Sequence, residues 1–285
     1  MGARRIAVAP QVLEFASDDP IAARALAALY HAAPPTTAVP TLRYALRRPA
    51  PDAGRWVATC PGRPAFGPAA LGDAWSFLEW RATEDLLNAP GTDAVFLHAA
   101  GAEIGGRLAL IVGESGAGKS TLVAHLMLRG HCTLGDDVVR FAPASGRFSA
   151  VGRSMKLDPN SLRAMPLIAS RCAAATVGTL LAAGCYYVSP AAIRRSWQAG
   201  DGRPWAVILL DAARRTGEPG LERASEGEAV VSVTQQVLGA GADGAPRQEE
   251  TTVRLLEVLA DVTAYRAVGS DPAAVAAALE REALR

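Results

Sequence analysis

The sequence contains very little lysine. Only two of its 29 basic residues are lysines, Lys119 and Lys156, and the others are arginines. A lysine ammonium is a compact point charge, whereas an arginine guanidinium is a planar fork. Because arginine serves almost everywhere that a cation is present, we expect the two lysines where a compact ammonium is needed. We therefore predict that Lys119 and Lys156 contact phosphate groups.

Other features are scarce or missing as well. The four cysteines lack the paired short spacing of zinc ligands and are too few for a disulfide scaffold, so we expect reduced thiols. No stretch reaches the roughly 20 apolar residues of a membrane helix. The net charge is +1 and the arginines are dispersed, which gives no electrostatic reason for binding nucleic acid or an anionic membrane. We expect a globular, cytoplasmic protein with neither of these partners.

The run GESGAGKST has the pattern of a phosphate-binding loop, with a buried strand predicted before it and a helix after it. Its glycines let backbone N–H groups point at phosphate oxygens, and the helix adds its positive end. Lys119 would reach the β and γ phosphates, and the Ser120 hydroxyl would bind Mg²⁺. The alternative is a glycine-rich turn that only resembles the motif. The predicted nucleotide-binding residues are Gly113, Glu114, Ser115, Gly116, Ala117, Gly118, Lys119, Ser120 and Thr121.

An aspartate pair, Asp136 and Asp137, follows the predicted loop helix. Adjacent side chains on an extended backbone point to opposite sides, so the two carboxylates can take different roles. Phosphoryl transfer to a hydroxyl needs a carboxylate at the Mg²⁺ and another that accepts the hydroxyl proton. A solvated turn is the alternative, but carboxylates beside such a loop are the usual Mg²⁺ partners. We predict one role for each aspartate.

The remaining sequence predicts an α/β fold in two parts. Residues 1–72 are rich in proline and short apolar runs, which indicates a small β-rich N-terminal lobe, and residues 73–285 would form the main domain. The pattern of residues 73–88 predicts an amphipathic helix with one buried face. That face comprises Trp75, Leu78, Ala82 and Leu86. Further strands are expected at 94–100, 138–143, 147–152, 205–211 and 264–269, and helices at 250–263 and 271–285.

Three segments together resemble a known family. They are LHAAG with His98, the loop GESGAGKST, and RGHCTLGDD. Their order and separations are similar to those of HPr kinase/phosphorylase and its divergent relatives, which share a phosphoenolpyruvate-carboxykinase-like P-loop fold. The resemblance is closest over residues 95–140. It implies a P-loop kinase with a mixed sheet and flanking helices, and ATP and Mg²⁺ as cofactors.

The resemblance also implies roles for single residues. In the family the first aspartate of the pair lies near the serine to be phosphorylated and acts as base, a role that would fall to Asp136. Asp137 would bind the metal together with Ser120, and His98 would lie near the phosphates. Without the resemblance, a histidine on an apolar strand is more often a satisfied core residue.

The stretch VGRSMKLD departs from the family, which carries a glutamate in the comparable region. Lys156 in this stretch resembles a lysine that related kinases place after a hairpin, and its ammonium could neutralise charge on the transferred group. The alternative is a surface lysine without such a role. No arginine-rich loop like that used for phosphorolysis is found, so we do not expect the reverse activity.

The N-terminal third does not look like the sensor domain of full-length HPr kinases. The chain is similar instead to the HPr-kinase-related proteins encoded with ribosomally made peptides, including lasso-peptide clusters. This implies an ATP-dependent serine kinase that phosphorylates a small peptide or protein. A small-molecule kinase on the same fold and a nucleotide-binding switch without transferase activity are the alternatives. The sequence leaves open whether the protein forms a homo-oligomer.

Overall fold

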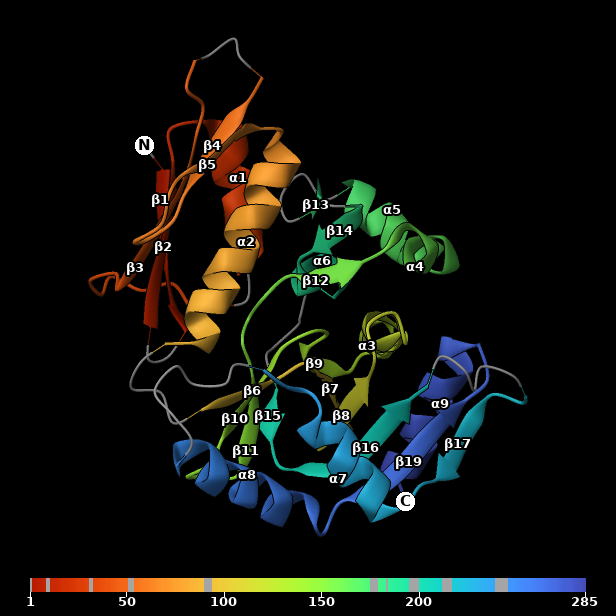
Figure 1. Cartoon of the computed structure of the whole chain (residues 1–285). Coiled ribbons are helices and arrows are strands. Elements are labelled where there is room, and N and C mark those ends of the chain that lie inside the picture. Colours follow the sequence, from red (N-terminus) through yellow and green to blue (C-terminus); the bar gives the residue numbers. More distant parts are fainter. Residues whose placement is uncertain are drawn as a thin grey trace. The chain divides into compact units, whose positions relative to one another are not determined.

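The chain forms two compact units. The computed structural model describes residues 2–8, 11–30, 33–50, 54–89, 94–174, 179–182, 184–194, 200–211, 217–238 and 246–285. Unit 1 comprises Met1–Thr92 and Gly152–Ile193, and unit 2 comprises Asp93–Val151 and Arg194–Arg285. Each unit combines helices with more than one sheet (Figure 1). The predicted α/β class with mixed sheets is confirmed at this level.

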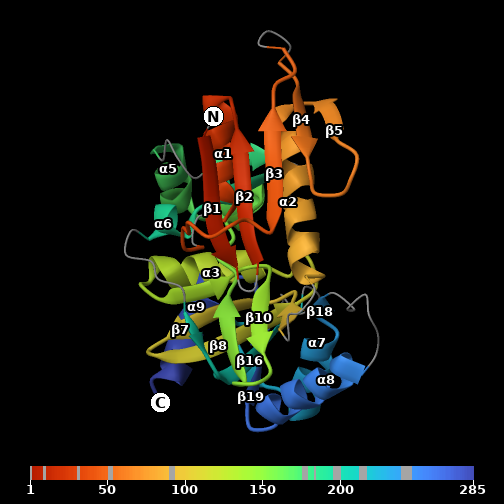
Figure 2. The same ribbon diagram turned by 90° about the vertical axis from the view of Figure 1, so that its left-hand side faces the viewer.

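Unit 1 is built on a five-stranded sheet with the order β1-β2-β3-β4-β5. β2 and β3 run parallel, and the other neighbouring pairs run antiparallel (Figure 2). Helix α1, Pro20–Leu29, connects β2 to β3 and begins where the Asp19 carboxylate accepts two backbone N–H groups. The strands are β1 Gly2–Val8, β2 Gln11–Ser17, β3 Leu42–Arg47, β4 Trp56–Thr59 and β5 Phe66–Ala69.

Helix α2, Leu71–Leu87, supplies much of the core of unit 1. The predicted face is confirmed, because all four of its side chains are at most 1% exposed. The helix begins two residues earlier than predicted and has Ala70 as its N-cap. The indole ring of Trp75 packs edge-on against the Tyr187 ring, with 4.2 Å between the ring centroids.

A three-stranded antiparallel sheet with the order β12-β14-β13 completes unit 1. Its strands are β12 Met155–Leu157, β13 Thr179–Ala182 and β14 Cys185–Val188. The same segment of the chain also contains the helices α4 Pro159–Ala164, α5 Pro166–Ala174 and α6 Pro190–Ile193. The predicted boundary after residue 72 differs from this division. Both α2 and this second segment cluster with the N-terminal strands, because their apolar side chains pack together, as Trp75 and Tyr187 do.

Unit 2 contains a six-stranded mixed sheet with the order β17-β19-β16-β8-β7-β9. β8, β16 and β19 run parallel to one another, and the remaining neighbours run antiparallel. The strands are β7 Ala100–Ile104, β8 Arg107–Gly113, β9 Cys132–Gly135, β16 Pro204–Leu210, β17 Gly220–Arg223 and β19 Thr263–Val268. Three of these strands, β8, β16 and β19, confirm predicted strands.

A second, antiparallel sheet in unit 2 has the order β15-β11-β10-β6-β18. β10 and β11 confirm the strands expected at 138–143 and 147–152, and they pair with each other as an antiparallel hairpin. The strands are β6 Val95–Leu97, β10 Val139–Ala142, β11 Arg147–Ala150, β15 Asp201–Gly202 and β18 Val237–Leu238.

The core of unit 2 lies between its two sheets and two helices, α7 (Glu226–Thr234) and α8 (Pro246–Leu259). Alternate residues of β8 face this core, where Phe141 and Phe148 meet them from the other sheet. Helices α3, Lys119–Leu128, and α9, Pro272–Ala283, contact each other and the six-stranded sheet (Figure 1). In the described parts of the chain, no helix is long and apolar enough to cross a membrane.

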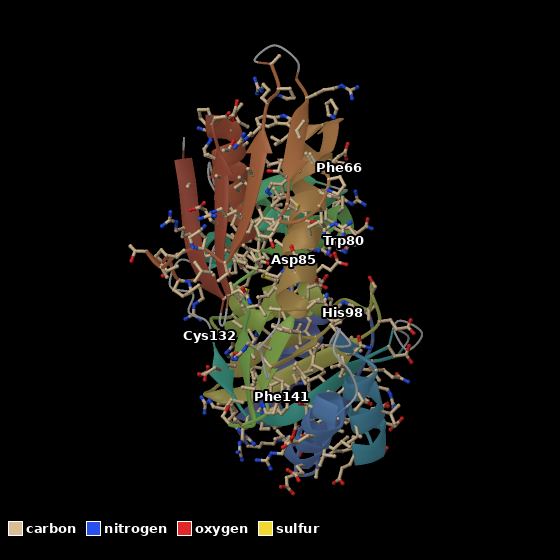
Figure 3. All side chains as sticks on the ribbon, turned by 60° about the vertical axis from the view of Figure 1, so that its left-hand side comes forward. Phe66, Trp80, Asp85, His98, Cys132 and Phe141 are labelled. Carbon is tan, nitrogen blue, oxygen red and sulfur yellow. The ribbon has the colours of Figure 1, made fainter. Side chains whose placement is uncertain are left out.

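Two tryptophans of α2 allow a matched test of this packing. Trp75 is fully buried, so Trp75→Ala is expected to lower the free energy of unfolding of unit 1 by about 3–5 kcal/mol. Trp80 lies on the same helix (Figure 3) with 52% of its surface exposed, and its ring contacts Phe77 and Arg81. Trp80→Ala should cost within about 1 kcal/mol. Urea unfolding measures both, and equal losses would contradict the assigned core.

Candidate functional site

Strand β8 carries the glycine-rich loop at its carboxyl end. Its interior residues Leu108–Val112 are all buried, with β7 on one side and β16 on the other. A Cβ atom at Gly113 would stand 2.4 Å from the backbone oxygen of Leu210 on β16. Glycine is therefore required where β8 ends, because no side chain fits between the two strands there.

The loop turns from β8 into helix α3 through two glycines in the left-handed region. Gly116 has a φ of 80° and Gly118 a φ of 94°. Gly118 is the N-cap of α3 and offers no side-chain acceptor to the first N–H groups of the helix. N–H groups at a helix start, together with the helix dipole, favour an anion. Strand, loop and helix thus follow in the predicted order.

The side chain of Lys119 folds back over its own loop. The residue is only 5% exposed, and its ammonium donates to the carbonyl oxygens of Gly113 at 2.7 Å and Glu114 at 3.1 Å. Burial lowers the pKa of Lys119, while the charges of Asp137 and Asp136 act to raise it. The structure therefore brings the loop lysine and the aspartate pair within electrostatic reach of one another.

The aspartate pair lies in a bend directly after β9, not on an extended strand as predicted. The Thr133 hydroxyl fixes the end of β9 by donating to the Gly101 carbonyl at 2.8 Å. Asp136 is buried with 4% exposure, whereas the side chain of Asp137 is 30% exposed. The two carboxylates have different surroundings, as two roles require, and the bend is the physical cause.

His98 directly follows β6 (Figure 3), and its side chain contacts Asp137 of the aspartate pair. Its backbone N–H donates to the Gln236 carbonyl at 2.7 Å, which fixes its position against β18. Its Nε2 is 3.1 Å from the Asp137 carboxylate, and its side chain is 28% exposed. His98 is therefore not a core residue, and its ring contacts the more exposed aspartate.

Ser120 lies in the first turn of α3, next to Lys119. Throughout the described residues, no group of three or more His, Cys, Asp and Glu side chains is placed to hold a metal ion by itself. Mg²⁺ in nucleotide sites commonly keeps several waters and is bound by one or two carboxylates together with substrate phosphates. The Ser120 hydroxyl and the aspartate pair fit that kind of site.

Lys156 belongs to unit 1, on β12, while Lys119 belongs to unit 2. Its ammonium is 3.4 Å from the Glu79 carboxylate and 5.5 Å from the centre of the Tyr187 ring. Glu79 is 5% exposed and also forms an ion pair with Arg153. Lys156 therefore helps to compensate a buried carboxylate within unit 1.

Asp211 was not singled out from the sequence, although strand 205–211 was predicted. It directly follows β16, and Leu210 is paired with Gly113 in the register of β16 and β8. Asp211 is exposed and lies at the same edge of the sheet as the loop. The signal was the apolar run WAVILL ending in an acidic residue.

The far end of α3 is held by the C-terminal helix. Glu280 on α9 forms ion pairs with Arg129 and with His131, the latter at 2.6 Å. Hydrogen bonds from Arg129 and, to a smaller extent, from His131 lower the pKa of the Glu280 carboxyl. The helix that begins at the loop is thus anchored at both ends.

Comparison with protein families finds no family model that matches the chain, and comparison with curated proteins finds no match. The geometry of the site and the resemblance of its motifs are therefore what indicate a function. The central element of that geometry is the loop between β8 and α3.

The close approach of β8 and β16 can be tested with two glycines of the same loop. Gly113→Ala places a methyl group against the Leu210 carbonyl, so unit 2 is expected to lose thermal stability. At Gly116 the added methyl group of Gly116→Ala meets open space. The only cost is that of alanine in a left-handed backbone conformation, roughly 1–2 kcal/mol. Thermal unfolding of both variants should give the lower Tm for Gly113→Ala. Equal values would argue against the contact.

The anchor of α3 has a defined pH dependence. Because the pKa of Glu280 is lowered in the folded state, its stabilisation is present above the unfolded value and lost as pH falls through the folded one. Glu280→Gln should reduce stability at neutral pH, and the difference from the parent protein should shrink below about pH 4. Urea unfolding at several pH values measures this. Glu257→Gln, at a 53% exposed side chain, is the control, and a pH-independent difference for Glu280→Gln would contradict the assignment.

Proposed function

We propose that the protein is an ATP-dependent phosphotransferase of the HPr-kinase-like P-loop type. The observation that carries the proposal is the buried Lys119 in a glycine loop, with an aspartate pair within electrostatic reach. Strand β8 and the glycine loop precede that lysine, and helix α3 begins with it. This is the order that a triphosphate site needs, and the start of the helix has no side-chain cap. The resemblance of the three motifs to HPr kinases supports the same conclusion.

The loop would hold the phosphates of the nucleotide. N–H groups of the loop and of the start of α3 would donate to the phosphate oxygens. The Lys119 ammonium, which now bonds to two loop carbonyls, would turn to the β and γ oxygens. Ser120 and Asp137 would hold Mg²⁺, which supplies charge neutralisation and orientation of the phosphates when bound. His98 would position Asp137 through their contact.

Asp136 would act as the base. The acceptor hydroxyl oxygen attacks the γ-phosphorus, and the bond from that phosphorus to the β–γ bridging oxygen breaks. The nucleoside diphosphate leaves, and the hydroxyl proton passes to the Asp136 carboxylate. Burial of Asp136 keeps bulk water from the carboxylate that receives the proton. Lys119 would serve as the loop cation that neutralises charge on the transferred group.

The acceptor that we propose is a serine of a small peptide or protein. The resemblance to kinases encoded with ribosomally made peptides supports this choice. A small-molecule hydroxyl compound would need the same nucleotide site and the same base. A nucleotide switch would need the loop but not a base beside it. The buried Asp136 favours a transferase over a switch.

The decisive test is a mass spectrum of serine-containing peptides encoded beside the gene, after incubation with the protein, ATP and Mg²⁺. We expect the gain of a phosphoryl group on a serine. Asp136→Asn should slow that transfer on the order of 10³-fold, because the hydroxyl proton loses its acceptor. Nucleotide binding of this variant should stay close to that of the parent protein.

Asp201→Asn is the matched control, because Asp201 is an exposed aspartate of unit 2 that pairs with Arg147. Its transfer rate should be unchanged. Full activity of a folded Asp136→Asn variant would rule out the base assignment. Bound ATP with phosphorylation of a free hydroxyl compound alone would replace the peptide by a small-molecule acceptor.

A further inference from the structure

The metal site of the proposed function can accept a second carboxylate besides Asp137. One of the Asp137 oxygens is engaged by His98 at 3.1 Å. The stretch VGRSMKLD has no glutamate, although the family that the chain resembles carries one in the comparable region. In P-loop nucleotide sites, Mg²⁺ is held by the loop serine or threonine and by an acidic residue that commonly follows a neighbouring strand. A carboxylate at such a position would complete the site.

The register of the parallel strands places Asp211 next to the loop. β8 and β16 pair from Leu108 to Gly113, and the last pair joins Gly113 to Leu210. The residues that follow the ends of these two strands are Glu114 after β8 and Asp211 after β16. Neighbouring strands are about 4.8 Å apart, so the backbone of Asp211 leaves the sheet beside the first turn of the loop.

The close contact at this edge fixes the position of Asp211 further. The Leu210 oxygen approaches Gly113 so closely that only a glycine fits there. The Lys119 ammonium bonds to the carbonyl oxygen of Gly113, which is paired with Leu210, and to that of Glu114, the next residue of the loop. Asp211 therefore adjoins the part of the loop that holds the lysine.

The change in burial along β16 also places Asp211 at the open edge of the sheet. Ala206, Val207 and Ile208 are fully buried, whereas Asp211 is exposed. In α/β sheets, ligands bind outside the carboxyl ends of parallel strands. An exposed carboxylate at that edge, one strand away from a phosphate loop, lies where a nucleotide-bound cation would be.

We infer that Asp211 is a further carboxylate of the divalent-cation site and binds Mg²⁺ directly or through one of its waters. This inference rests on the proposed function. It assigns Asp211 to the metal and not to the phosphates, since a carboxylate repels anionic oxygens that no cation screens. Loss of Asp211 therefore affects metal binding and leaves metal-free nucleotide binding intact.

The test compares nucleotide and metal affinities of the full chain. Calorimetry measures ATP binding in the presence of a chelator and with Mg²⁺, and electron paramagnetic resonance measures Mn²⁺ binding to the protein–ATP complex. Asp211→Asn is expected to bind metal-free ATP like the parent protein and to bind Mn²⁺ roughly 10–100-fold more weakly. Asp211→Glu, which keeps the carboxylate, should recover part of that affinity.

Asp261→Asn is the matched control. Asp261 is also exposed and belongs to unit 2, but it lies before the amino end of β19, which runs parallel to β16. Its Mn²⁺ affinity should equal that of the parent protein. Unchanged Mn²⁺ affinity in Asp211→Asn, or an equal loss of metal-free ATP binding, overturns the inference. A parent protein that binds no ATP at all overturns the proposed function and this inference with it.

Discussion

The parallel pairing of β8 with β16 is the constraint on which the candidate site depends. Both strands run through the core of unit 2, and their carboxyl ends meet so closely at Leu210 that residue 113 must be glycine. That contact sets where the backbone leaves the sheet and where α3 begins. Lys119, in the first turn of α3, folds back over the same strand end. The geometry of the loop is a consequence of strand pairing in the core.

The two lysines of the chain compensate buried charge in opposite ways. In unit 2, Lys119 is the buried cation, and loop carbonyls and the aspartate pair stabilise it. In unit 1, Glu79 is the buried anion, and Arg153 and Lys156 stabilise it. A buried charge is tolerated when it is paired and hydrogen-bonded. The rarity of lysine therefore marked two electrostatic centres, one in each unit.

Local patterns predicted the parts of the molecule that depend on neighbouring residues. The glycine loop, the buried face of α2 and the β10–β11 hairpin could be read in this way, because each is set within a few residues. The division into units could not, because the contact of Trp75 with Tyr187 joins distant parts of the chain. The place of Asp211 likewise depends on the register between β8 and β16, for which no short pattern exists. The sequence left both a strand and a turn open at the aspartate pair, because adjacent polar residues are compatible with either, and the structure has a bend there.

Both units are interrupted in the sequence, and this affects how the chain can fold during synthesis. Unit 1 lacks its three-stranded sheet until Val188 has been made, and unit 2 lacks the parallel neighbour of β8 until Leu210 has been made. Domains generally fold as units while the chain emerges, and long-range strand pairing is slow. β8 therefore leaves the ribosome as an apolar strand without its parallel partner. The loop that it carries acquires its final shape only when most of the protein has already been translated.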